Sequence, residues 1–201
     1  MILPRNGEAT QGRLMDAALD LYAQRGYAGT CLDAILTSAS SSKGAFYHHF
    51  DSKEALTAQA VTVHWNYVVE LLQRAWQGKP DSDNKLTALL LELKSAYYSR
   101  SGGCPLGLLG FESRSLPPQV QEALTRGLER WTVALAAMLR ELGIESRKQA
   151  RDLAQQLFVV FEGGILIERM SGLSTALELG LAGWQKDVQD ALEGVGESRA
   201  A

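Results

Sequence analysis

Hydrogen-bonding side chains gather between residues 41 and 53, and small residues lie among them. Their hydroxyl, ammonium, phenol and imidazole groups belong to Ser41, Ser42, Lys43, Tyr47, His48, His49 and Lys53. Such groups donate hydrogen bonds to phosphate oxygens and to the edges of bases. Gly44 and Ala45 would let the backbone approach a nucleic acid closely. The chemistry that this segment could do is therefore binding of DNA.

A thiol in a glycine-rich loop is the second reactive feature. Cys104 lies in Gly102-Gly-Cys-Pro-Leu-Gly107, where we expect the N-terminus of a helix, and Arg100 and Arg114 are close in sequence. Helix N–H groups and nearby cations favour the thiolate, which can be oxidised or alkylated. Three roles stay open for Cys104: sensing of oxidants or electrophiles, lining of a pocket, and packing as a small apolar residue. We expect Cys31 to lie in the core.

Apolar periodicity places the first cluster in a helix-turn-helix. A first helix is predicted over about residues 8–25 and ends at Gly26. Thr30 should cap the N-terminus of the second helix. Residues 40–42 form the turn, and residues 43–50 form the short helix that would enter the major groove.

Two aromatic residues should hold this short helix on the head. Phe46 and Phe50 are four residues apart and should face inward above Ile35. Asp51 and Glu54 have the spacing of a capping box that opens the next helix.

Helical patterns continue along the rest of the chain. The runs cover residues 52–76, 86–98, 106–113, 117–142, 146–170 and 173–192. No alternating strand pattern accompanies them. We therefore predict an all-α protein of about nine helices, with a three-helix helix-turn-helix DNA-binding head at 1–54. A larger helical body at 55–201 would bind a ligand and pair two chains.

Composition restricts the function less than the motif does. The 201-residue chain is 46% hydrophobic and has a net charge of −3, and residues 1–54 carry five Lys or Arg against six Asp or Glu. DNA binding would thus depend on the placement of a few cations, not on a basic domain. No apolar run is long enough to span a bilayer, and the first residues do not read as a signal peptide. We expect a cytoplasmic protein without membrane contact, whose cysteines are free thiols.

The segment from Thr30 to Leu56 resembles the DNA-reading half of the TetR family of bacterial transcriptional regulators. The matching positions are Thr30, Ala39, Ser42, Lys43, Gly44, Tyr47, His49, Phe50, Ser52, Lys53 and Glu54. The resemblance implies contact with the DNA backbone, or support of that contact, by Thr30, Lys43, Tyr47, His49 and Lys53. Base readout would fall to Ser41, Ser42, Ala45 and His48.

The turn departs from the family pattern at two adjacent positions. Ser40 stands where the family commonly has Gly, and Ser41 stands where it commonly has Val. Gly adopts positive φ readily, whereas Ser does so at a cost, so the head should be less stable or its turn altered.

Structural roles stay open for some of these residues. Thr30 could serve only as a cap, and His49 could be a packed histidine. His48 and His49 are adjacent, so their side chains diverge by about 100° on a helix, and no carboxylate or thiol is spaced to complete a metal site. We expect no metal and no cofactor.

The resemblance implies a body that binds a small molecule and pairs two chains. Aromatic residues that could line such a pocket are Trp65, Tyr97, Tyr98, Phe111, Trp131, Phe158 and Phe161. Ordinary packing is an alternative for each of them. The Gly-Cys-x-Leu-Gly stretch followed by Glu112 resembles a subgroup in which this loop borders the sensing pocket, and in which some members respond to electrophiles. The effector would be apolar, aromatic or electrophilic.

The last two helices are expected to form a homodimer interface, as the resemblance implies, and Gly163-Gly164 would allow close helix packing. A symmetric dimer would bind a palindromic operator. The expected function is a repressor that a ligand or thiol modification releases from DNA. An activator and a regulator without an inducer remain alternatives. A cysteine enzyme that pairs Cys104 with His64 or Glu112 is a remote one.

Overall fold

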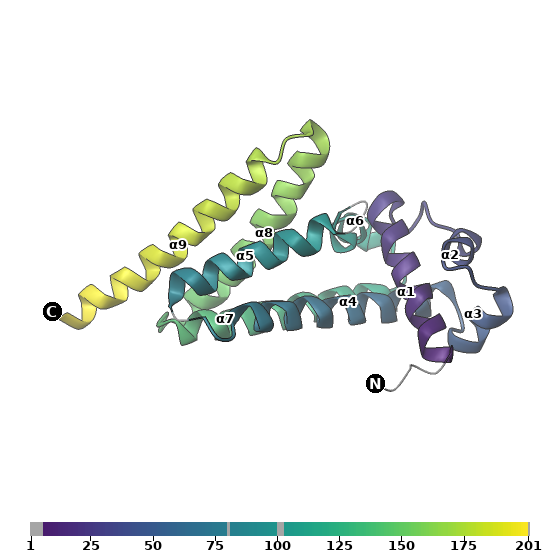
Figure 1. Ribbon diagram of the computed structural model, residues 1–201, viewed down its shortest axis with the longest axis horizontal. Coiled ribbons are helices and arrows are strands. Elements are labelled where there is room, and N and C mark those ends of the chain that lie inside the picture. Colours follow the sequence, from purple (N-terminus) through teal and green to yellow (C-terminus); the bar gives the residue numbers. More distant parts are fainter. Residues whose placement is uncertain (1–5, 80, 100–102, 201) are drawn as a thin grey trace. The chain divides into compact units, whose positions relative to one another are not determined.

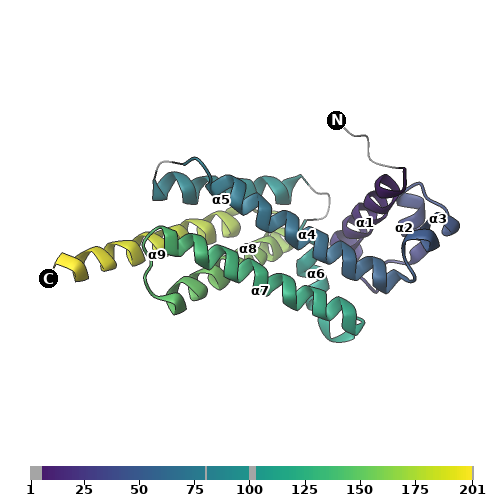
Figure 2. The same ribbon diagram turned by 90° about the horizontal axis from the view of Figure 1, so that it is seen from below.

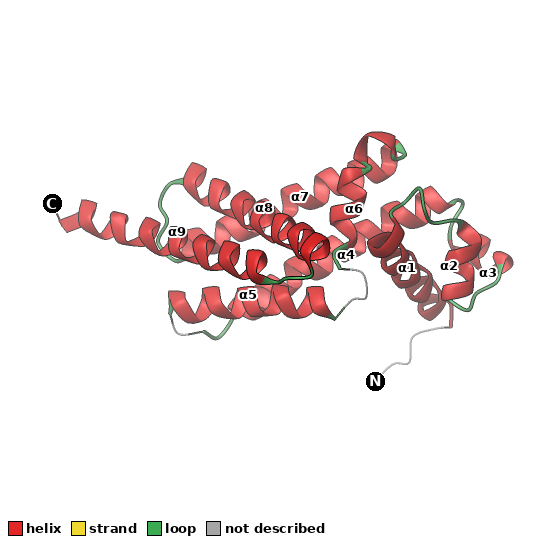
Figure 3. Cartoon of the chain, turned by 90° about the horizontal axis from the view of Figure 1, so that it is seen from above, coloured by secondary structure: helices red, strands yellow, loops and turns green. Residues whose placement is uncertain are grey.

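A computed structural model describes the chain over residues 6–79, 81–99 and 103–200. Its nine α-helices are α1 Asn6–Arg25, α2 Leu32–Ser38, α3 Lys43–His49, α4 Lys53–Trp76, α5 Ser82–Tyr98, α6 Pro105–Phe111, α7 Pro118–Glu141, α8 Arg147–Ser171 and α9 Thr175–Ala200. A 3-10 turn, Ser113–Ser115, follows α6. Figure 3 shows that the described ranges contain helices and loops without a strand. The predicted all-α fold is confirmed.

Packing divides the chain into two compact units. The N-terminal unit comprises Met1–Asn66 and Tyr97–Gly127, and the C-terminal unit comprises Tyr67–Ala96 and Leu128–Ala201. Both α4 and α7 contribute residues to each unit. The predicted division into a head at 1–54 and a body at 55–201 stays a prediction.

The N-terminal unit is built on an apolar core to which α1, α2, α3 and α4 contribute. Side chains without any exposed surface come from each of these helices, among them Leu14, Tyr22, Ile35, Phe46 and Leu56. The hydroxyls of Tyr22 and Thr57 lie 2.7 Å apart, so this buried phenol has a hydrogen-bond partner. Figure 1 shows α1, α2 and α3 grouped near the start of α4. Later in the chain, α6 packs against α1 and buries Leu106 and Leu109.

The predicted caps of α2 and α4 are wrong by one residue each. Cys31 is the N-cap residue of α2, because the hydroxyl of Thr30 instead donates to the carbonyl oxygen of Gly26 at 2.8 Å. That carbonyl lies just beyond the last turn of α1, where no helical N–H group can reach it. At α4 the hydroxyl of Ser52, not the carboxylate of Asp51, accepts the N–H of Ala55 at 3.1 Å.

The turn between α2 and α3 has the geometry that the serine substitutions predict. Ser40 has φ +49° and is the only residue other than glycine with positive φ in the described ranges. The next side chain, Ser41, has a buried Oγ without a hydrogen-bond partner among the described residues. The α3 helix then begins after Ser42, whose hydroxyl accepts the N–H of Ala45 at 3.1 Å. The turn is therefore formed at a cost in backbone strain and in one unsatisfied hydroxyl.

In the C-terminal unit, α8 and α9 lie side by side and antiparallel (Figures 1 and 2). Two glycines allow the close approach: a Cβ added to Gly164 would lie 2.7 Å from Leu177 Cα, and one added to Gly180 would lie 2.7 Å from Val160 Cγ1. The buried indole of Trp184 also donates to the carbonyl oxygen of Leu153 at 2.7 Å. Close packing at Gly164 agrees with the prediction, whereas a Cβ at Gly163 would meet nothing within 4 Å.

Replacing Ser41 with valine should raise the free energy of unfolding by about 1 kcal/mol, because it removes a buried hydroxyl that lacks a partner. Urea denaturation followed by circular dichroism measures this change. Ser41→Ala is the matched variant, since it removes the same hydroxyl without adding methyl groups, and it should stabilise the protein less. Loss of stability in both variants would show that the hydroxyl is satisfied in solution.

Candidate DNA-binding site and the loop around Cys104

The short helix α3 has one buried face and one exposed face. Phe46 and Phe50 are buried, with ring centroids 5.8 Å apart, as predicted. The exposed face carries Lys43, Gly44, Tyr47 and His48, while Ala45 and His49 are partly buried. Tyr47 is 58% exposed, although its ring also contacts that of Phe46, with ring centroids 5.1 Å apart. This face presents an ammonium, a phenol and an imidazole to solvent.

Gly44 is not required by packing within the chain. A Cβ built there would meet only the hydroxyl of Ser42, at 3.9 Å, which is ordinary contact. The absence of a side chain instead keeps the N-terminal turn of α3 flat. A flat surface at this point suits close approach of the backbone to a duplex.

The cation at the start of α3 is paired within the head. Lys43 Nζ lies 3.1 Å from Asp33 Oδ1 on α2, and both side chains are largely exposed. An exposed pair of this kind contributes about 0–1 kcal/mol, so Lys43 can exchange its partner for a phosphate at little cost. Asp33 was not among the residues that the sequence predicted for this site. Its position in the first turn of α2, opposite the start of α3, could not be read from spacing alone.

Thr30 and Lys53 are placed as supports beneath the exposed face. Thr30 is 1% exposed. Lys53 Nζ donates to the carbonyl oxygens of Thr30 at 2.8 Å and Tyr27 at 3.1 Å, and it lies 3.7 Å from the centroid of the Tyr27 ring. Burial of this ammonium lowers the pKa of Lys53. Of the two roles that the resemblance implies, these contacts favour support over direct contact.

Tyr27 is a central residue that sequence reasoning missed. Besides its contacts with Lys53, its hydroxyl donates to Glu54 Oε1 at 3.1 Å, and its ring lies 5.8 Å from that of Tyr22. Burial, and hydrogen bonding of the neutral phenol to Glu54, raise the pKa of Tyr27. The signal in the sequence is weak: an aromatic residue directly after the glycine that ends a helix.

Glu112 was predicted as a sensor residue, and its carboxylate contacts the turn between α1 and α2. Its Oε2 accepts the N–H of Tyr27 at 2.5 Å, and its Oε1 accepts the N–H of Ala28 at 3.2 Å. Gly26 has φ +71°, and a Cβ there would lie 2.8 Å from both carboxylate oxygens. Only glycine fits this position, for reasons of both backbone conformation and space.

The two histidines of α3 contact each other, with ring centroids 4.9 Å apart. In the part of the chain that the structure describes, no group of three or more His, Cys, Asp or Glu side chains could hold a metal ion. The role that we expect for the two histidines, hydrogen bonding to phosphate or bases, stays a prediction.

Cys104 lies at the N-cap position of α6 and is partly exposed. Gly103 precedes it with φ +88°, and a Cβ there would lie 2.8 Å from the Tyr97 ring, so this aromatic residue lies against the loop. Gly102 and Arg100, which the sequence suggested as part of the same environment, lie outside the described residues.

Cys31 is exposed, not in the core as expected. It precedes the first turn of α2 in extended conformation and so does not share the apolar face of that helix.

The predicted aromatic residues fall into both units. In the N-terminal unit Trp65 is buried, Tyr97 is partly buried, and Tyr98 and Phe111 are 51% and 72% exposed. The C-terminal unit contains the other three, Trp131, Phe158 and Phe161. Of these, the rings of Trp131 and Phe158 lie 6.1 Å apart.

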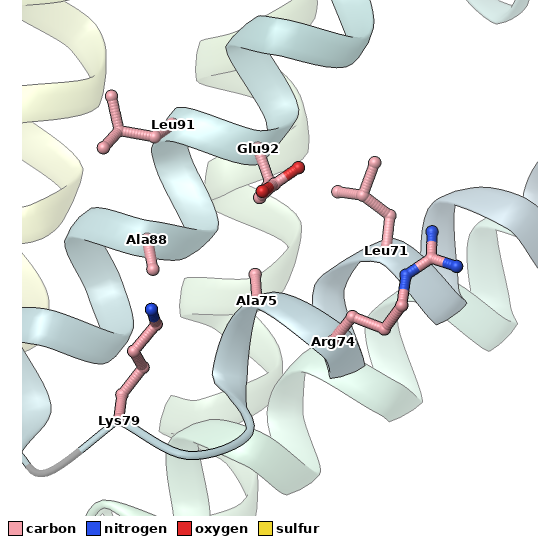
Figure 4. A pocket seen from close by; sticks show the side chains of 7 residues that line it. All are labelled: Leu71, Arg74, Ala75, Lys79, Ala88, Leu91 and Glu92. Atoms are coloured by element: carbon pink, nitrogen blue, oxygen red, sulfur yellow. The ribbon is translucent and has the colours of Figure 1, made fainter.

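One pocket of about 400 Å³ lies between α4 and α5 in the C-terminal unit. It is lined by Leu71, Arg74, Ala75, Lys79, Ala88, Leu91 and Glu92 (Figure 4). Figure 4 shows that Ala75 and Leu71 of α4 lie opposite Ala88 and Glu92 of α5. The lining mixes leucines with two cations and a carboxylate. None of the aromatic residues predicted for a sensor pocket belongs to it.

An all-helical chain in which a tight turn joins the short helices α2 and α3 has the arrangement of a helix-turn-helix DNA-binding protein. Residues 14–60 match the model of the bacterial regulatory proteins of the tetR family, and residues 87–180 match that of the LmrA/YxaF-like transcriptional regulator C-terminal domain. The chain belongs to the TetR family and is a DNA-binding transcriptional regulator.

Individual relatives support this assignment. The chain is 31% identical over 160 residues to the transcriptional regulator AcuR of Cereibacter sphaeroides, which covers 76% of this chain and 73% of AcuR. It is also 28% identical over 168 residues to the HTH-type transcriptional regulator LmrA of Bacillus subtilis. That alignment covers 82% of this chain and 89% of LmrA. The crystal structure of reduced E. coli NemR has a TM-score of 0.74 at 24% identity, with 88% of this chain and 96% of NemR covered, and thus shares the fold. Among the described helices, none combines the length and hydropathy that crossing a bilayer requires.

Asp33→Asn should strengthen binding to DNA, because it removes a negative charge beside α3 and releases Lys43. We expect affinity for a duplex selected from a random pool to rise about threefold at low salt, and the gain to shrink as salt is added. Fluorescence anisotropy measures both. Asp152→Asn is the matched control, since Asp152 pairs with Lys148 on the surface of the C-terminal unit. Equal effects of the two substitutions would show that Asp33 acts only through net charge.

Proposed function

We propose that this regulator is a homodimeric repressor that binds a palindromic operator through α3 of each copy and leaves it when an effector acts. The observation that carries the proposal is the exposed face of α3, where Lys43, Tyr47 and His48 surround a glycine that packing does not require. Lys43, Tyr47 and His49 would contact phosphates. Ser42, Ala45 and His48 would face base edges.

The structure favours base readout by Ser42 more than by Ser41. Ser42 is exposed, and although its oxygen accepts the N–H of Ala45, its own proton remains available to a base. Ser41 has a buried oxygen, so its part in readout would need a local rearrangement. Thr30 and Lys53 would act from below, by holding the turn that precedes α2.

An exposed apolar strip on α8 and α9 supports pairing of two copies. On α8 the strip consists of the exposed residues Val159, Leu166, Ile167 and Met170 with the partly buried Gly163 at helical spacing among them. On α9 it includes Leu179 and Gly183. A Cβ at Gly163 or Gly183 would meet nothing within 4 Å, so both glycines leave room for a second chain. Residues of this kind are covered in a dimer, and the symmetry of a dimer suits a palindromic operator.

The effector is proposed to act through the loop around Cys104, in the manner of the Gly-Cys-x-Leu-Gly subgroup. Partial exposure of the thiol supports access by an electrophile or oxidant. Binding of an apolar or aromatic ligand without covalent chemistry is the second candidate, supported by the ring of Tyr97 against the loop. An activator would use the same head, and we propose a cytoplasmic location, where DNA and a reduced thiol occur together.

Gly44→Leu should separate DNA binding from folding. Since Gly44 is exposed and a Cβ there makes only ordinary contact, the melting temperature should stay within about 2 °C of wild type. Affinity for the selected duplex should fall at least about tenfold, because the side chain blocks close approach. Gly194→Leu, at an open position near the end of α9, is the control. Unchanged affinity of Gly44→Leu in a mobility-shift assay would contradict the role of α3.

Alkylation tests the sensor loop. The thiolate attacks the C=C bond of N-ethylmaleimide: a C–S bond forms, the π bond breaks, and the resulting carbanion takes a proton from solvent. We expect this reaction to release wild-type protein from the selected duplex. Cys104→Ser should stay bound after the same treatment, whereas Cys31→Ser, which removes the exposed thiol of the head, should be released like wild type. Release of Cys104→Ser would move the sensor away from this loop and towards Cys31.

A further inference from the structure

Glu112, directly after the C-terminal end of α6, contacts the turn between α1 and α2. Its two oxygens accept the N–H groups of Tyr27 and Ala28, from a position 84 or more residues later in the chain. A carboxylate that accepts two N–H groups forms charge-assisted bonds, which are stronger and more directional than neutral ones. This contact is therefore a specific link and not a general packing contact.

The main chain of Glu112 is itself held firmly. Its N–H donates to the carbonyl oxygen of Leu108 at 3.2 Å, and its carbonyl oxygen accepts both the N–H and the hydroxyl of Ser115 at 2.8 Å. Between Cys104 and Glu112 the helix α6 has only seven residues, and it buries Leu106 and Leu109. These contacts fix the main chain from which the carboxylate of Glu112 extends.

The turn that Glu112 holds determines where α2 begins. On its other side Lys53, at the start of α4, donates to the carbonyl oxygens of Tyr27 and Thr30. The N–H groups of the turn are thus held by an anion and its carbonyls by a cation. Since α3 follows α2 through the short turn at Ser40, the placement of α3 on the head depends on both contacts.

We infer that Glu112 is a positioning residue for DNA recognition, which holds the α1–α2 turn and thereby sets where α2 and α3 lie on the head. The inference rests on the proposed DNA binding through α3. It predicts that loss of the carboxylate weakens specific binding, although removal of a negative charge by itself strengthens general attraction to DNA.

The test compares Glu112→Gln with wild type on two duplexes, one selected from a random pool by the wild-type protein and one with the same bases scrambled. We expect affinity for the selected duplex to fall about tenfold or more, as for loss of charged hydrogen bonds, while affinity for the scrambled duplex is unchanged or slightly higher. A variant that was merely less folded would lose both affinities equally. Glu122→Gln removes an exposed carboxylate that pairs with Arg126 and should keep the wild-type ratio.

Two further outcomes decide the inference. If Glu112→Gln lacks the wild-type circular dichroism spectrum, the test uses Glu112→Asp in its place. Aspartate keeps the charge but is shorter by one methylene, so this variant should also lower the ratio of the affinity for the selected duplex to that for the scrambled one. An unchanged ratio in a folded variant overturns the role of Glu112. Equal affinity of wild type for both duplexes would instead overturn the proposed function.

Discussion

The carboxylate of Glu112 and the ammonium of Lys53 hold one turn from opposite sides, and the DNA-binding head depends on that turn. A chain that leaves a helix exposes N–H and carbonyl groups that lack helical partners. Here the N–H groups of Tyr27 and Ala28 are satisfied by an anion, and the carbonyls of Tyr27 and Thr30 by a cation. Gly26 makes the arrangement possible, because any side chain there would meet the carboxylate.

The same contacts limit the positive charge that this chain, with net charge −3, can present to DNA. Of the cations near α3, Lys53 is used within the head, and Lys43 lies beside Asp33. Few positive charges are left for phosphate, so long-range attraction contributes little. The proposed binding would then depend on close fit of α3, with which the bare surface at Gly44 and the exposed ring of Tyr47 agree.

Local patterns predicted most of the fold and the orientation of α3. Helical spacing of apolar residues was sufficient to place Phe46 and Phe50 inward, and the Ser40 position was correctly identified as one that needs positive φ. The cap of α4 was missed by one residue because Asp51 and Ser52 are adjacent and both can cap. The cap of α2 was missed because the hydroxyl of Thr30 donates backwards to Gly26, and Cys31 at the N-cap position makes no side-chain cap bond. The contact of Glu112 with Tyr27 could not be predicted, since it joins segments 85 residues apart and leaves no periodic signal. The exposure of Cys31 was missed because the residue was predicted to lie on α2, whereas it precedes that helix in extended conformation.

The central claim, that this regulator contacts DNA through α3, is tested most directly by amide hydrogen exchange of the full chain with and without the selected duplex. The account predicts slower exchange in peptides that cover residues 41–49 when DNA is bound, and unchanged exchange along α5. Unchanged exchange over residues 41–49, with protection elsewhere in the chain, would contradict it.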